Sequence, residues 1–279
     1  MILQRPFQSL PLILAALAAI ACRPEPEQRY GFIARLGQDT VSVESITRRG
    51  NKVVVDGVDR FPRVSRRHTE IELGPGSTIR HLVMDIHTPS EPANQRERHV
   101  TADVTVDSVH ILKTDAAGKL KYNFATSGAV AMAHVPQMYS LYELYFDAAI
   151  ARGVAEKRKL GDTVQLRQFY IDREFDRFPL HHGVVRLVSG NRAEIQHDWL
   201  SGTGQATFDS TFRRMLTYSG ARTTYLVEVA RLDSPPEIKP IADKWEALEA
   251  AGGGVKELSP RDTARGTIGN VSITIDYSR

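Results

Sequence analysis

Apolar and polar side chains alternate with a period of two through most of residues 30–233. In the clearest segment, Val100–Val106, valine and alanine alternate with threonine and aspartate. Successive side chains of a strand point to opposite faces, so such a segment buries one face and exposes the other. Turn sequences such as Gly74–Gly76 and Asp115–Gly118 separate the segments. The sequence therefore predicts a mainly β domain with an antiparallel curved sheet, a meander or half-barrel. In it, the segment Thr40–Thr47 places Val41 and Val43 on one side of a strand.

One segment departs from this alternation. After Pro136, apolar residues follow the helical spacing i, i+3, i+4 and i+7, and Gly153 suits a helix C-cap. We expect a helix over residues 136–152, inserted into the β domain. Its apolar stripe is most simply a face that packs on the sheet, and the alternative is an apolar ligand pocket with phenol groups at its mouth. These candidate ligand-binding residues are Met138, Leu141, Tyr142 and Tyr145.

Residues 234–254 follow the β domain. They predict a short amphipathic helix that carries Trp245 and Leu248, and a flexible linker at Gly252–Gly254. The linker is the best candidate for a domain boundary. Beyond it, Val271–Tyr277 alternates again and predicts a half-buried strand.

The final 22 residues resemble the opening of a bacterial all-β family of unknown function. The matching residues are Ser259-Pro260, Ile268-Gly269 and the strand Ile273-Thr274-Ile275-Asp276-Tyr277-Ser278-Arg279. The resemblance implies that residues 255–279 are the first strands of a truncated C-terminal β domain. It implies no activity.

The N-terminus has the form of an export signal. Arg5 precedes Leu10–Ala21, an apolar run that is too short for a membrane span of ~20 residues, and small residues end it. We expect residues 1–21 to be a signal peptide.

The signal ends at Cys22, the only cysteine of the chain, in Ala19-Ile20-Ala21-Cys22. This box resembles the signal of bacterial lipoproteins. The resemblance implies that Cys22 is acylated and binds the membrane, that residues 22–29 form a tether, and that the protein lies in the cell envelope. Arg23 after the cysteine implies the outer membrane, with the domain facing the periplasm. The alternative is ordinary cleavage that leaves Cys22 a free thiol.

Charge and cysteine content exclude two classes of protein. The chain carries 36 Lys and Arg against 33 Asp and Glu, and the two signs are interleaved. Nucleic-acid binding needs basic residues gathered on one face with stacking aromatics, so we expect no nucleic-acid partner. A single cysteine cannot form an internal disulfide, so the exported domain depends on burial alone for its stability.

The sequence contains none of the common catalytic motifs, neither Gly-x-Ser-x-Gly, nor His-Glu-x-x-His, nor a P-loop. One arrangement suggests chemistry. A hairpin that turns at Ser189–Asn191 would place His182 almost opposite His197 and Asp198, where they could bind zinc or act as acid and base. A register slip of one residue reverses every side chain, and surface histidines explain the same residues.

These observations predict an envelope lipoprotein that is more a binding module than an enzyme. In element order the body resembles periplasmic lipoprotein carriers, which implies a fold and no function. The expected ligand is a lipid, another hydrophobic small molecule or an envelope partner, with zinc as the one cofactor that the histidines suggest. The alternatives are a metal-dependent or acid/base hydrolase, and a structural spacer for a missing C-terminal domain.

Overall fold

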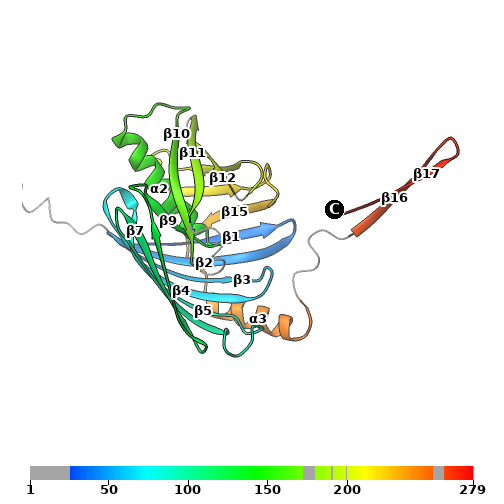
Figure 1. Ribbon diagram of the computed structural model, residues 1–279, viewed down its shortest axis with the longest axis horizontal. Coiled ribbons are helices and arrows are strands. Elements are labelled where there is room, and N and C mark those ends of the chain that lie inside the picture. The colour runs from blue at the N-terminus through cyan, green and yellow to red at the C-terminus, as the bar shows by residue number, and fades with distance from the viewer. Residues whose placement is uncertain (1–25, 172–179, 190, 199, 254–260, 279) are drawn as a thin grey trace, which may run out of the picture.

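The computed structural model describes residues 26–171, 180–189, 191–198, 200–253 and 261–278. It confirms a mainly β protein with one large curved sheet that is not closed (Figure 1). The predicted signal peptide and Cys22 lie outside the described residues, and the first strand begins at Gln28, inside the expected tether. No helix in the described ranges has both the length and the apolar character needed to cross a membrane.

The first half of the sheet is a meander of eight strands, each antiparallel to the next. The short helix η1 (Pro75–Ser77) lies between the fourth and fifth strands. The strands are β1 (Gln28–Leu36), β2 (Asp39–Arg49), β3 (Lys52–Asp59), β4 (Ser65–Leu73), β5 (Ile79–His87), β6 (Glu97–Val104), β7 (Ser108–Asp115) and β8 (Gly118–Ala125).

The second half begins with a crossover and returns as another meander. Helix α2 (Tyr139–Ala155) connects two parallel strands, β9 and β10, and the later pairs are antiparallel. The strands are β9 (Ala131–His134), β10 (Thr163–Tyr170), β11 (His181–Ser189), β12 (Arg192–His197), β13 (Gly204–Phe208), β14 (Met215–Ser219) and β15 (Val227–Leu232).

The two halves join where β1 pairs with β15. The register runs from Gly31 opposite Leu232 to Leu36 opposite Val227. The first and last strands of the sheet-forming segment therefore lie next to each other in the middle of the sheet, and β8 and β9 form its edges.

Helix α2 lies within the concave side of the sheet. Every residue from Tyr139 to Phe146 is buried, which covers all sides of two helical turns. The helix contacts β2, β9, β10 and β11, and the main core cluster surrounds it. A helix in such a position needs no polar face, in contrast to one that covers a sheet from outside.

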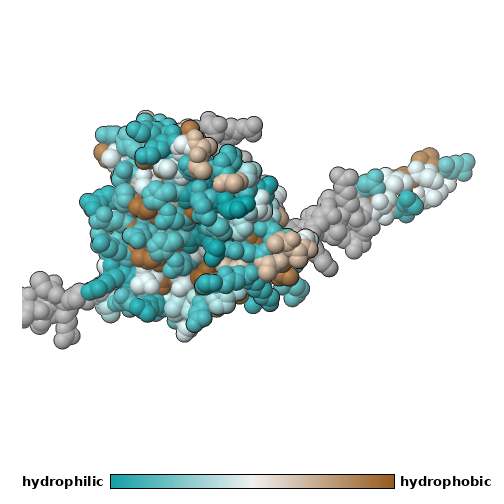
Figure 2. All heavy atoms as spheres, turned by 90° about the horizontal axis from the view of Figure 1, so that it is seen from below, coloured by the Kyte–Doolittle hydropathy of each residue, from teal (hydrophilic) through white to brown (hydrophobic). Residues whose placement is uncertain are grey.

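Helix α3 (Ile238–Ala250) covers the opposite face of the sheet, near β2 and β3. Trp245 packs with Val43 and Val58 in a second, smaller cluster, whereas Leu248 is exposed. The prediction that Val41 and Val43 lie on one side of the strand was therefore wrong. The register shift between Ala34 and Arg35 makes Val41 an extra residue of β2 and turns Val43 toward α3. Its neighbours Ser42 and Glu44 point inward instead. The outside shown in Figure 2 is largely hydrophilic, with apolar residues scattered singly.

The C-terminal residues form a separate hairpin. Strands β16 (Arg261–Ile268) and β17 (Val271–Ser278) pair only with each other within the described chain. The predicted strand is confirmed, but its apolar side chains Val271, Ile273 and Ile275 are exposed and not half-buried.

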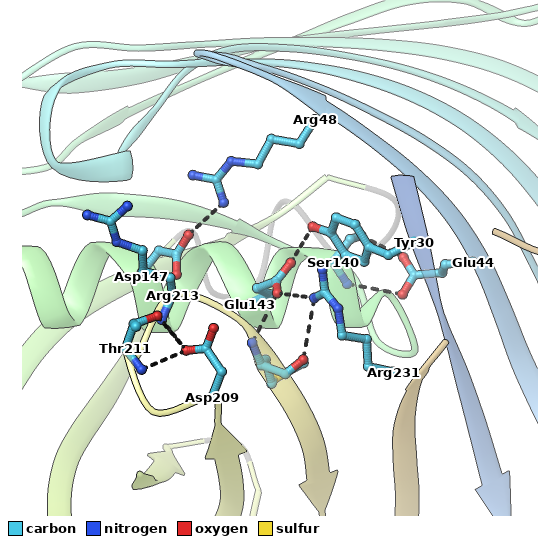
Figure 3. A network of polar contacts seen from close by, with 11 residues as sticks. Tyr30, Glu44, Arg48, Ser140, Glu143, Asp147, Asp209, Thr211, Arg213 and Arg231 are labelled. Atoms are coloured by element: carbon cyan, nitrogen blue, oxygen red, sulfur yellow. Dashed lines mark hydrogen bonds and ion pairs between the residues drawn. The ribbon is translucent and has the colours of Figure 1, made fainter. Parts of the chain in front are cut away.

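A glutamate from β2 caps the N-terminus of α2. The carboxylate of Glu44, 1% exposed, accepts hydrogen bonds from the Tyr139 and Ser140 backbone N–H groups at 2.6 and 3.0 Å and from Ser140 Oγ at 2.6 Å (Figure 3). The free N–H groups of the first turn favour such an anion. Burial nevertheless raises the pKa of Glu44 to about 7, against the effect of these bonds.

We expect the stability of the wild type, relative to a Glu44→Gln variant, to fall as the pH rises from about 4.5 to about 8. The folded-state pKa of about 7 lies above the ~4.3 of an unfolded glutamate, so the folded protein holds the additional proton in this window. The stability that protonated Glu44 contributes is fully present below the pKa of glutamate in the unfolded chain. It is lost as the pH rises through the pKa of Glu44 in the folded protein. Denaturant titrations of both proteins across this range measure the difference, with a slope of up to about 1.4 kcal/mol per pH unit.

The comparison of two proteins is needed because buried histidines act in the opposite sense. Burial lowers the pKa of His134 and His197, so the unfolded chain binds protons at these residues more readily than the folded protein does. The free energy of unfolding therefore rises with pH until the imidazoles of the unfolded chain have lost their protons. Both proteins retain these histidines, so the difference isolates Glu44. A difference that does not vary with pH would contradict the assignment.

Candidate ligand-binding cavity

A cavity of about 490 Å³ lies beside the N-terminus of α2. Its walls come from both halves of the sheet. The β3–β4 connection, the segment before α2, the first turn of α2, the end of β10 and the β14–β15 connection each supply part of it. The apolar and aromatic part of the wall consists of Phe61, Pro62, Tyr142, Tyr170, Leu200 and Tyr225.

Gln137 is a polar residue of this wall that two hydrogen bonds hold in place. Its side-chain Nε2 donates to the Phe61 carbonyl at 2.5 Å, and its own carbonyl accepts from Ser42 Oγ at 2.8 Å. The backbone of Gln137 has φ +71°, a conformation that side-chain-bearing residues seldom adopt. Such local strain persists where surrounding contacts hold it, and it is found often at ligand sites.

This turn also explains where α2 begins. The sequence predicted a helix from Pro136, but the left-handed conformation of Gln137 interrupts it, and regular helix starts at Tyr139. Glu44 then holds the first two helical N–H groups. The predicted end at Arg152 is confirmed to within one helical turn, at Ala155.

The charged groups at the cavity are arranged in pairs. Arg67 forms an ion pair with Asp59, and both are buried. Arg63 at the rim is bonded to Glu91, with Nη1 and Oε1 2.5 Å apart. Each arginine of the wall is therefore matched by a carboxylate.

The four predicted ligand-binding residues are all buried. Tyr142 lines the cavity. Met138, Leu141 and Tyr145 belong to the main core, which is the packing role weighed against the ligand pocket in the sequence. Tyr145 lies against Gly183 of β11, where only a glycine leaves room for its ring.

The predicted histidine hairpin forms, and its side chains diverge. His197 lies opposite Gly183 and is buried near the ring of Tyr142, with centroids 5.7 Å apart. His182 and Asp198 are exposed, and Asp198 accepts hydrogen bonds from His181 Nδ1 at 2.8 Å and from the His182 backbone N–H at 2.7 Å. The structure thus joins Asp198 to the His181-His182 pair and separates His197 from them.

Across the described residues, no group of three or more histidine, cysteine or acidic side chains is placed to hold a metal ion. Five of the nine histidines instead lie on the exposed face of β4–β7, each hydrogen-bonded through Nδ1 to a side chain of a neighbouring strand. The pairs are His68–Asp56, His81–Asp103, His87–Glu97, His99–Asp85 and His110–Asn123. The zinc prediction for His182, His197 and Asp198 therefore receives no support from their geometry.

A second polar cluster lies along α2 and ties it to the sheet (Figure 3). The side chain of Glu143 is 2% exposed. Its carboxylate accepts hydrogen bonds from the Tyr30 hydroxyl and from Arg231 Nη1, the latter at 2.7 Å. One turn later, Asp147 accepts from Arg48 Nη1 at 2.8 Å, and burial raises the pKa of Asp147 to about 7. These pairs connect α2 to β1, β2 and β15, which is a structural role.

The residues that sequence reasoning missed are Phe61, Gln137, Tyr170 and Tyr225. Each lies in a connection or at the end of an element, where no periodic pattern exists. Adjacent Pro136 and Gln137 before the helical stripe are the only local signal in the sequence, and the helical spacing assigns them to the helix.

Comparison with known proteins assigns neither a family nor a function to the chain. No family model matches the chain, and no curated protein matches it. Among solved structures, the chain is similar to a DUF1089 family protein from Pseudomonas aeruginosa, with 9% sequence identity and a TM-score of 0.48. The alignment covers 66% of this chain and 91% of that one. A likeness of this size carries no functional argument.

We expect Gly183→Ala to destabilise the protein and Gly57→Ala to leave it nearly unchanged. A Cβ at position 183 would lie 2.1 Å from Tyr145 Oη, whereas one at position 57 would meet its nearest neighbour at 3.5 Å. Overpacking of this kind costs about 1–3 kcal/mol. Thermal and denaturant unfolding of both variants measure the cost, and equal stabilities would show that Tyr145 is not packed against β11.

Proposed function

We propose that the protein is a non-enzymatic binding module that holds a lipid or another hydrophobic small molecule in the cavity beside α2. The observation that carries this proposal is the cavity itself. It remains open within a core in which α2 is otherwise enclosed, and its wall is rich in aromatic side chains. Its volume of about 490 Å³ falls in the ~300–1,000 Å³ range of small-molecule sites.

The chemistry of the wall supports binding more than catalysis. A hydrolase needs a nucleophile or activated water beside a base of suitable pKa. Among the described residues at the cavity, the carboxylate of Asp59 is committed to Arg67, and the other polar side chains are arginine, glutamine, threonine and tyrosine. Rigid aromatic side chains with few polar groups are typical of ligand sites.

We also propose that the protein is anchored at Cys22 in the cell envelope, at the outer membrane. The lipobox-like end of the apolar run supports this assignment. Only five residues separate Cys22 from Gln28 at the start of β1, and the six Cα–Cα steps between them span at most about 22 Å. The sheet would therefore lie close to the membrane, where amphiphilic ligands are concentrated.

We expect Thr224→Trp to block uptake of an apolar fluorescent probe and Leu226→Trp to have no effect. Thr224 is exposed at the cavity, so an indole there fills the opening without disturbing the core. Leu226 is 61% exposed in the same connection but does not line the cavity. Fluorescence titration of the full chain measures binding, and native mass spectrometry identifies any ligand that copurifies. Equal binding by both variants would place the probe elsewhere.

We expect Cys22→Ser to abolish incorporation of labelled fatty acid and to move the protein from the membrane fraction to the soluble extract. The thiol is the acylation site implied by the lipobox, and serine removes it with little change of size. Labelling and fractionation of cells that express each form test this. Unchanged labelling would overturn the anchor at Cys22.

A further inference from the structure

We infer that the ligand of the α2 cavity is uncharged and donates a hydrogen bond, from a hydroxyl or an N–H group, to Gln137 Oε1. This inference rests on the proposed function and specifies the class of ligand. Two independent observations carry it. One is a buried acceptor without a partner, and the other is the neutral charge balance of the wall.

The acceptor is the side-chain oxygen of Gln137. The residue is 5% exposed, and its Oε1 has no hydrogen-bond partner among the residues that the structure describes. Its orientation is fixed, because Nε2 donates to the Phe61 carbonyl and a flipped amide would place two oxygens together. Gln137 is one of the residues that line the cavity.

A buried acceptor that remains unpaired is costly, and natural proteins pair almost all such groups. The left-handed backbone of Gln137 and the bond from Ser42 hold the residue in this place. Both constraints fit a site that is completed by its ligand.

The charge balance argues against an ionic ligand. Arg67 is bonded to Asp59 and Arg63 to Glu91, so the positive charge of each guanidinium is already balanced by a carboxylate. Tyr142 and Tyr225 stay neutral, because burial raises the pKa of both phenols. A charged ligand would lose its hydration on entering the cavity and would find no unpaired opposite charge among the described residues there.

The ligand class that meets both conditions is a neutral amphiphile. Its apolar chain or ring would lie among Tyr142, Tyr170 and Tyr225, and its hydroxyl or amide N–H would face Gln137. Long-chain alcohols and fatty amides have this chemistry, whereas fatty acids and alkylamines do not.

The test measures the affinity of the full chain for four probes of equal chain length: decanol, decyl methyl ether, decanoate and decylammonium. The ether matches decanol in its apolar chain but lacks the donor. We expect decanol to bind roughly two- to tenfold more tightly than the ether, and both ions to bind more weakly than the ether.

A Gln137→Met variant is the matched control on the protein side. Methionine keeps the length and linear shape of glutamine but accepts hydrogen bonds only weakly. We expect it to lose the preference for decanol over the ether, and the ratio of the two affinities is the quantity compared with the wild type.

The outcomes separate this inference from the proposed function. Binding of no probe would overturn the proposed function and the inference with it. Equal affinity of the wild type for decanol and the ether, or tightest binding of decanoate, would overturn the inference alone. These comparisons use the wild type, so they decide the question even where the variant does not fold.

Discussion

The carboxylate of Glu44 determines how the interior of this protein is arranged. A helix enclosed by a sheet cannot satisfy its first N–H groups with water, and they need an acceptor from the protein. Glu44 supplies it from β2, at 2.6 and 3.0 Å from two of them. The cap fixes the point at which α2 begins, and with it the turn that carries Gln137 and the cavity beside it. One buried side chain thus links the sheet, the helix and the candidate site.

The remaining polar contacts of α2 decide which strands it faces. Glu143 and Asp147 lie one turn apart and bind Arg231 of β15 and Arg48 of β2. Buried ion pairs contribute little net stability compared with apolar packing, but an incorrect placement would leave their charges unpaired. They therefore restrict the helix to one position and rotation against the region where the two halves of the sheet meet.

The sequence predicts the class of fold because period-two alternation is a direct consequence of strand geometry. It predicts less well which face of a strand points inward. Around Val43 both faces are covered, by α2 on one side and α3 on the other, so apolar and acidic residues are buried alike. Glu44 was missed for this reason. The cavity was anticipated only through Tyr142, because its other walls come from connections whose positions depend on the complete fold. The hairpin of His182 and His197 was expected, and the faces of its side chains were not, since they depend on register.

The pairing of β1 with β15 affects how the chain can reach its native state. The two meanders consist of contacts between neighbours in sequence, whereas this one pair joins opposite ends of the domain. Contacts of large sequence separation form slowly, because a long loop must close first. During synthesis, which proceeds from the N-terminus, β1 therefore keeps one hydrogen-bonding edge unpaired until β15 has left the ribosome. For most of its emergence the domain remains incomplete, a state in which open strand edges invite association with other chains.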